Sequence, residues 1–234
     1  MSSLTLPSPR HKLYGRRQSR PLKTGQQALW QDCLPALLFN NNLCQDVDFW
    51  QRQTTCLEIG FGNGEHLFDQ ALNHPDRLYI GCEPFVNGVA SLLQKIGHQP
   101  VDNILIFPDD VRLLLTELPE RSLDMVVLLF ADPWPKKRHH KRRFIQTDQI
   151  KAIHRLLKTG GTWRIATDDA GYQDWILSHF STPEIQNLFH QQRQDIWQRP
   201  DTTDWPLTRY EQKALQAGRT PLYLVYEKVI VNPF

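Results

Sequence analysis

The chain has 234 residues, of which 27 are lysine or arginine and 25 are aspartate or glutamate, so its formal net charge is only +2. This length suits one sizeable domain with a full hydrophobic core. No apolar run approaches the length of a membrane span, and the basic N-terminus lacks the apolar segment of a signal peptide, so we expect a cytoplasmic protein without membrane attachment. The four cysteines lack metal-binding spacing, which predicts free thiols, no disulfide and no bound metal.

The basic residues are concentrated in two short segments. Residues 1–25 contain six lysines or arginines and no acid, and residues 136–143 contain six more. The rest of the chain has 15 basic and 25 acidic residues. An acidic body with two basic segments predicts local contact with phosphates. We expect residues 1–25 to form a flexible basic arm before a domain over residues 26–234, although a tail that only solubilises the protein is the alternative.

Residues 26–38 are predicted to form an amphipathic helix, because apolar side chains recur there every three or four positions; Pro35 is expected to kink it. Five strand patterns follow and alternate with helical patterns: residues 54–59, 78–82, 103–107, 125–129 and 162–166. Gly160 and Gly161 are expected to close the helix that precedes the fifth strand.

The end of the chain is less regular. Residues 181–207 fit an ordered loop or a small strand, residues 208–215 look helical, and residues 221–230 read as a long last strand. Alternating strands and helices predict an α/β fold. We therefore expect a doubly wound, mostly parallel, seven-stranded sheet with helices on both faces.

A glycine-rich turn follows the first strand. Gly60, Gly62 and Gly64 would let the backbone approach a ligand at the start of the next helix, as in nucleotide-binding folds. The spacing is not the G-x-G-x-x-G fingerprint of a pyrophosphate site. Glu58 precedes the turn inside the strand, where a purely structural strand would carry an apolar side chain.

Acidic side chains also stand at the ends of the later strands. They are Glu83, Asp109, Asp110, Asp132, Asp168 and Asp169. A single acid at a strand end is often only the N-cap of the next helix, but acids at the ends of so many strands favour a binding site. Glu83 lies 19 residues beyond Gly64, where an acid can accept both ribose hydroxyls. Carboxylates attract a sulfonium and an ammonium and repel a pyrophosphate, so S-adenosylmethionine is favoured over a nicotinamide dinucleotide.

The fourth strand ends in Asp132-Pro133-Trp134-Pro135, which leads into the basic run of residues 136–143. The two prolines predict extended geometry for Asp132 and Trp134, which would hold a carboxylate and an indole beyond the strand end. A carboxylate can accept the N1–H and N2–H of guanine, and an indole offers a stacking face. Such a contact would stabilise the cation formed by alkylation at N7, with catalysis by positioning and electrostatics.

Four blocks of the sequence carry a family resemblance: residues 57–64, 132–143, 166–168 and 208–211. Together they resemble the bacterial tRNA (guanine-N7)-methyltransferase family. The resemblance implies a Rossmann-like class I enzyme that transfers the methyl group of S-adenosylmethionine to N7 of a variable-loop guanine in tRNA, and it leaves monomer and homodimer open. Glu58, Glu83, Asp109 and Asp132 would contact the cofactor, with Asp132 also catalytic. The residues implied to meet tRNA or its target base are Lys136, Asp168, Thr208, Arg209, Tyr210 and Glu211.

Three other functions are compatible with parts of this pattern. Asp132-Pro133-Trp134 resembles the motif of exocyclic-amine methyltransferases, although the second consecutive proline is missing. A non-catalytic RNA-binding protein would use the basic segments without a cofactor, but the intact glycine turn and Glu83 argue against it. A nicotinamide oxidoreductase is the third alternative.

Overall fold

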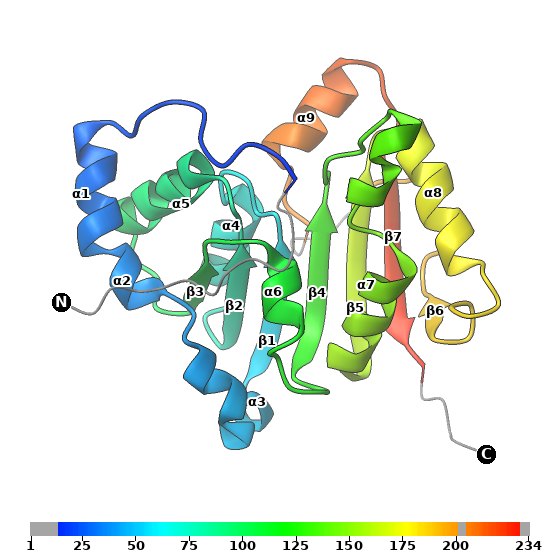
Figure 1. The fold of residues 1–234 in the computed structure, drawn as a ribbon, viewed down its shortest axis with the longest axis horizontal. Helices are drawn as coiled ribbons and strands as arrows, with labels where there is room; N and C mark the ends of the chain where they lie inside the picture. The colour runs from blue at the N-terminus through cyan, green and yellow to red at the C-terminus, as the bar shows by residue number, and fades with distance from the viewer. Residues whose placement is uncertain (1–13, 201–204, 230–234) are drawn as a thin grey trace.

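The computed structural model describes residues 14–200 and 205–229, which build a single seven-stranded sheet of order β3-β2-β1-β4-β5-β7-β6 (Figure 1). The strands are β1 (Thr54–Ile59), β2 (Arg77–Cys82), β3 (Ile104–Phe107), β4 (Leu123–Leu129), β5 (Leu157–Thr167), β6 (Phe189–Gln191) and β7 (Leu222–Lys228). Neighbours among β1 to β5 pair in parallel, whereas β7 runs antiparallel to both β5 and β6. The predicted doubly wound, mostly parallel, seven-stranded sheet is confirmed.

Helices cover both faces of the sheet. They are α1 (Thr24–Asp32), α2 (Leu34–Leu37), α3 (Val47–Arg52), α4 (Glu65–Asn73), α5 (Val86–His98), α6 (Val111–Leu115), α7 (Thr147–Leu156), α8 (Ala170–Phe180) and α9 (Arg209–Gln216), with short 3₁₀ turns η1 (Asn41–Gln45) and η2 (Lys137–Arg142). Side chains of α3, α6, α7 and α8 pack into one hydrophobic core, and those of α1, α2, α4 and α5 into another. Alternate residues of β2 enter the two cores, Ile80 on one face and Tyr79 on the other. Buried on both faces, these parallel strands read in the sequence as continuous apolar runs.

The helix predicted over residues 26–38 is wrong as a single element. The chain forms two helices there, α1 and α2, with Cys33 between them. Pro35 lies in the first turn of α2. Backbone N–H groups in a first turn have no acceptor within the helix, so a proline is tolerated there, and Pro35 starts a helix instead of kinking one. Helix α1 packs against α5 and α2, and α2 packs against the edge strand β3.

The role predicted for Gly160 and Gly161 is also wrong. Helix α7 ends at Leu156, and β5 begins directly at Leu157 and contains both glycines. The register of β4 with β5 shifts between Leu123 and Met125, because β5 contains additional residues between the partners of these two positions. Gly160 is one of these additional residues and has a φ of +73°. A left-handed glycine marks a bulge here and not a helix end.

Of the predicted arm over residues 1–25, residues 14–23 precede α1 and contact α5, and residues 24 and 25 begin α1. In Figure 1 this dark blue segment crosses over α5 toward the carboxyl end of β4. The carbonyl of Arg17 accepts the N–H of Val86, and Asn87 at the start of α5 accepts the N–H of Ser19 and donates to the carbonyl of Arg20. Residues 1–13 lie outside the described residues, so a flexible arm stays a prediction.

Among the helices of residues 14–200 and 205–229, none has both the length and the apolar character needed to cross a membrane.

Candidate active site

A pocket of about 370 Å³ opens at the carboxyl ends of β1, β2, β3 and β4. The pocket lies where the strand order reverses, between the parallel strands β1 and β4, which is the usual ligand site of an open α/β sheet. Of the residues predicted from the sequence, its lining contains Gly60, Gly62, Glu83, Asp109, Asp132 and Tyr210. The sheet therefore brings together side chains from four separate strand ends.

The glycine turn is shaped by close packing. Gly62 has a φ of +58°, and a Cβ there would lie 3.3 Å from the ring of Tyr210. Gly64, with a φ of +73°, lies outside the pocket lining, and its Cβ would come within 2.8 Å of Leu92 on α5. Gly88, which the sequence reasoning missed, would place a Cβ 2.2 Å from the carbonyl oxygen of Gly62. Gly64 and Gly88 thus bring α5 against the turn, and Gly60 and Gly62 face the pocket.

Glu83 is held at the end of β2 by two backbone donors. Its carboxylate accepts the N–H of Gly62 at 2.8 Å and the N–H of Phe85 at 2.9 Å, and the residue is only 8% exposed. Burial raises the pKa of Glu83 to about 7, against the lowering effect of these two hydrogen bonds, and the charges of Asp132 and Glu58 raise it further. The carboxylate is therefore fixed in position and short of positive charge.

Asp109 already has a cationic partner from the arm. Nη2 of Arg17 lies 2.7 Å from its Oδ1, although the two residues are 92 positions apart in the sequence. The next residue, Asp110, caps the N-terminus of α6 and pairs with Arg112. Tyr14, Gly15 and Arg16 also line the pocket. The sequence reasoning assigned this basic segment to RNA, and no local signal showed that it reaches the strand ends.

The turn after β4 departs from the predicted extended geometry. Trp134 has a φ of +44° and Phe130 a φ of +52°, so the expectation for Trp134 is wrong. Such left-handed backbone costs a non-glycine residue on the order of 1–2 kcal/mol and needs support from its surroundings. Arg143 supplies that support, because its Nε donates to the carbonyl of Pro133 at 2.8 Å. Asp132 reaches solvent at the pocket mouth, and its partial burial raises its pKa.

Arg143 is enclosed in the protein, although it ends the basic run. It is 2% exposed, its Nη1 donates to the carbonyl of Gly171, and its guanidinium lies over the rings of Tyr172 and Trp175. A cation so placed cannot reach a phosphate. It fastens the turn that carries Asp132 and Trp134 to the start of α8.

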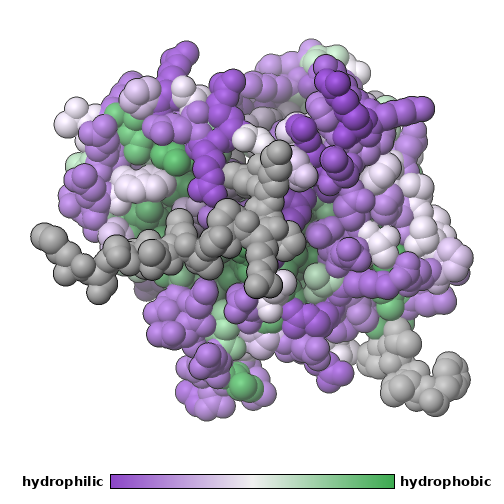
Figure 2. Space-filling model, viewed as in Figure 1, coloured by the Kyte–Doolittle hydropathy of each residue, from purple (hydrophilic) through white to green (hydrophobic). Residues whose placement is uncertain are grey.

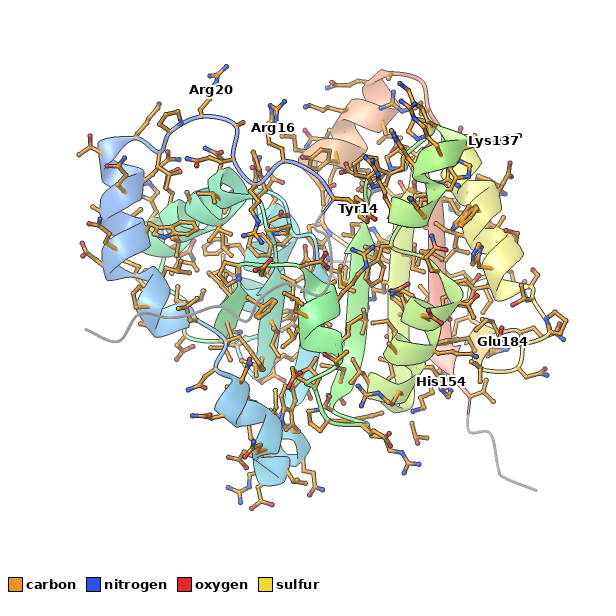
Figure 3. The ribbon with its side chains drawn as sticks, viewed as in Figure 1. Tyr14, Arg16, Arg20, Lys137, His154 and Glu184 are labelled. Carbon is orange, nitrogen blue, oxygen red and sulfur yellow. The ribbon has the colours of Figure 1, made fainter. Side chains whose placement is uncertain are left out.

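Arg142 points into the pocket instead. Its guanidinium carbon lies 5.0 Å from the ring centroid of Tyr14 and 4.9 Å from that of Trp134. By contrast, Lys136, Lys137, Arg138 and Lys141 are exposed. Figure 3 shows Tyr14 near the carboxyl end of β4, whereas Arg20 points away from the body of the protein. The visible face of the described residues is mostly hydrophilic, with purple side chains crowded toward α9 and the upper ends of α7 and α8 (Figure 2).

Glu58 does not line the main pocket. It is 5% exposed and lies 2.7 Å from Nδ1 of His66, beside a second hollow of about 20 Å³ that Thr208 and Tyr210 share. The carboxylate of Glu58 therefore contacts the buried side chain of His66.

The predicted substrate residues of α9 separate into exposed and enclosed positions. Thr208 caps the helix, and Tyr210 is 51% exposed and lines both hollows. Glu211 is fully enclosed, where it accepts the hydroxyl of Tyr223 and pairs with Arg199, so its side chain does not face an approaching tRNA. Arg209 is exposed. Away from α9, Asp168 pairs with Arg219 and is not part of the pocket lining.

The chain is similar over almost its full length to curated proteins. A family described as putative methyltransferase matches residues 52–224. A tRNA (guanine-N(7)-)-methyltransferase of Rhodospirillum rubrum is 42% identical over 95% of this chain and 89% of its own length. A protein of the same name from Granulibacter bethesdensis is 40% identical over 97% of this chain and 99% of its own length.

Solved structures with the same fold are more distant in sequence. A 16S rRNA (adenine(1408)-N(1))-methyltransferase from Catenulisporales acidiphilia aligns with a TM-score of 0.55 at 15% identity, over 84% of this chain and 95% of that one. At such low identity the likeness concerns the fold alone.

Proposed function

This chain belongs to the tRNA (guanine-N7)-methyltransferase family, and from that premise we propose that its strand-end pocket holds S-adenosylmethionine next to a guanine of the tRNA variable loop. The enzyme is a tRNA (guanine-N7)-methyltransferase. One observation supports this arrangement: Glu83, Asp109 and Asp132 line the same pocket as the glycine turn and the indole of Trp134.

The residues of the pocket fit the proposed cofactor. When bound, S-adenosylmethionine supplies an electrophilic methyl group on a positively charged sulfur. Glu83 would accept ribose hydroxyls, because its carboxylate is already oriented by the N–H groups of Gly62 and Phe85. The glycine turn leaves the backbone accessible, since nothing lies within 4 Å of the position that a Cβ of Gly60 would take. Asp109 adds a further carboxylate, which would bind the cofactor beside or in place of Arg17.

Asp132 is the proposed catalytic residue. Its carboxylate can accept the N1–H and N2–H of guanine in a bidentate contact, which is a charge-assisted hydrogen bond. That contact orients N7 and stabilises the positive charge that the ring gains on alkylation, so it is stronger in the transition state than in the ground state. Positioning and electrostatics then supply the acceleration, because the lone pair of N7 needs no general base.

The exposed basic residues would bind the tRNA backbone. Lys136, Lys137, Arg138 and Lys141 face solvent next to the pocket mouth, and Arg209 does so on α9. Phosphate contacts of this kind fix the register of an RNA without reading its sequence. Tyr210, half exposed between the two hollows, can contact the target nucleotide.

A methyl-transfer assay tests the proposal. Purified protein is incubated with labelled S-adenosylmethionine and unmodified tRNA, and the labelled nucleotide is then identified and mapped. We expect 7-methylguanosine in the variable loop. A methyl group on an exocyclic amine would support the rival reading of Asp132-Pro133-Trp134, and tRNA binding without transfer would support a non-catalytic RNA-binding protein.

A further inference from the structure

The guanidinium of Arg142 occupies a site made of aromatic rings. It contacts both Tyr14 and Trp134, at 5.0 Å and 4.9 Å from the ring centroids. Its Nε is buried and has no hydrogen-bond partner within residues 14–200 and 205–229. Two nearby arginines are paired with carboxylates that line the pocket, Arg17 with Asp109 and Arg112 with Asp110. Arg142 thus places a planar cation against two π faces, in a pocket rich in acids.

We propose that Tyr14 and Trp134 form the slot for the target guanine, which Arg142 fills in the free protein, and that this slot prefers the methylated, cationic base. The inference rests on the proposed function, since it assigns the place of the acceptor in the same pocket. Trp134 follows Asp132 by two residues, so the stacking face and the carboxylate belong to one short turn. Both line the pocket with Glu83 and the glycine turn.

The charge balance of the reaction explains why a cation marks the slot. The lone pair of N7 forms the new bond to the methyl carbon, and the pair of the sulfur–carbon bond stays on sulfur. The sulfonium becomes a neutral thioether, the base becomes a planar delocalised cation, and no proton moves. Aromatic faces attract such a cation more strongly than a neutral ring. The two rings therefore bind the transition state more tightly than the unmethylated base.

The two walls of the slot are supported differently. Trp134 is held in left-handed backbone by the buried Arg143, so this wall is rigid. Tyr14 lies on the segment before α1, which is attached through the Arg17 carbonyl and the Arg17–Asp109 ion pair. Arg142 must leave when the base enters, because its guanidinium occupies the place against the two rings, and it would repel the cation that methylation forms there. The exposed basic residues beside it receive phosphates, so the released guanidinium moves toward anionic partners.

Nucleoside binding provides a test that does not depend on turnover. The probes are guanosine and 7-methylguanosine at about pH 6, where the methylated base is a cation, titrated by calorimetry into protein saturated with S-adenosylhomocysteine. We expect a preference of about tenfold for 7-methylguanosine in the wild type. Tyr14→Leu and Trp134→Leu should lose this preference, and Trp197→Leu, at an exposed tryptophan outside the pocket, should keep it.

Arg142→Ala gives the sharpest result. Removal of the competing side chain should tighten binding of 7-methylguanosine severalfold. If Arg142 instead binds a phosphate of the substrate and never occupies the base position, the same variant binds the nucleoside no better than the wild type. That outcome, or a preference that persists in both leucine variants, overturns the proposal.

Turnover on tRNA separates the slot from the proposed function. Tyr14→Leu and Trp134→Leu should lower kcat about tenfold or more with a smaller change in KM, and Tyr14→Phe and Trp134→Phe should recover most of it, because phenylalanine keeps a π face. A wild-type protein that makes no 7-methylguanosine in tRNA would refute the proposed function. A wild type that makes it while both leucine variants match it would refute the slot alone.

Discussion

The two sides of the pocket are built on different principles. The proposed cofactor side, from β1 to β3, carries Glu83 and the glycine turn at regular strand ends, with the carboxylate fixed by backbone N–H groups. The proposed acceptor side, after β4, has left-handed backbone at Phe130 and Trp134. Arg142 contacts aromatic rings there, and the buried Arg143 donates to backbone carbonyls. A small molecule of constant shape can be held by a fixed set of acceptors. A base that enters from a large RNA requires side chains that can be displaced.

The largest effect is expected on the acceptor side, at Asp132. Asp132→Asn keeps the size of the side chain but removes the charge that stabilises the alkylated ring. We expect a loss of about 10² or more in the rate of methyl transfer under single-turnover conditions, with the fold intact by circular dichroism. Turnover equal to that of the wild type would remove Asp132 from the catalytic role.

Arg143 tests whether the acceptor side depends on a buried support. Arg143→Met leaves the carbonyls of Pro133 and Gly171 without their donor, so the free energy of unfolding in urea should fall by about 1–3 kcal/mol. The matched control Arg138→Met, at an exposed position of the same run, should change it by no more than about 0.5 kcal/mol. Equal stability of the two variants would show that the enclosed guanidinium contributes nothing to the turn.

On the cofactor side, Glu83→Ala should weaken S-adenosylmethionine binding by about 1.5–3 kcal/mol, because ribose hydroxyls lose a charged acceptor. Calorimetry with the cofactor measures this, and tRNA affinity measured by filter binding serves as the control that should change little. An unchanged cofactor affinity would place the ribose elsewhere in the pocket.

The pKa of Glu83 adds a pH dependence to the same side. Burial raises this pKa to about 7, so the carboxyl group is mostly protonated at lower pH and accepts hydroxyl groups poorly. Cofactor affinity should therefore rise about tenfold from pH 6 to pH 8 and then level off, and Glu83→Gln should flatten that rise. Because the folded-state pKa lies above the unfolded value, Glu83 favours the fold most at low pH, and this contribution is lost as pH rises to about 7. A flat affinity profile in the wild type would contradict the assignment.

The smallest effects concern single exposed cations of the acceptor side. Lys137→Gln or Lys141→Gln should each lower the salt slope of tRNA binding by roughly 0.7–0.9, with no change in S-adenosylmethionine binding. Filter binding over a range of salt concentrations gives the slope. Arg143→Met should leave the slope unchanged, since that side chain does not meet solvent. A similar decrease of the salt slope in all three variants would mean that the buried Arg143 and the exposed lysines do not differ in their contact with tRNA.

The sequence by itself determined the sheet and the gathering of acidic side chains at its strand ends. The five patterns of apolar residues predicted β1 to β5 within a few residues of their observed bounds, apart from the start of β5. Strand patterns are local and periodic, and parallel strands end at one edge, so acids at strand ends such as Glu83, Asp109 and Asp132 could be expected to converge before any contact was known.

Only the tertiary structure decided how the charged residues are used. Arg142 and Arg143 are adjacent in one basic run, yet one lines the pocket and the other is buried against α8. Glu58 is buried beside His66. Glu211 is buried too, and it contacts Tyr223 and Arg199. Trp134 adopts left-handed backbone that its neighbouring proline disfavours. The partner of a charged side chain depends on which residues the fold places next to it. Arg17 pairs with Asp109, 92 positions away in the sequence, and no local sequence pattern predicts such a pair.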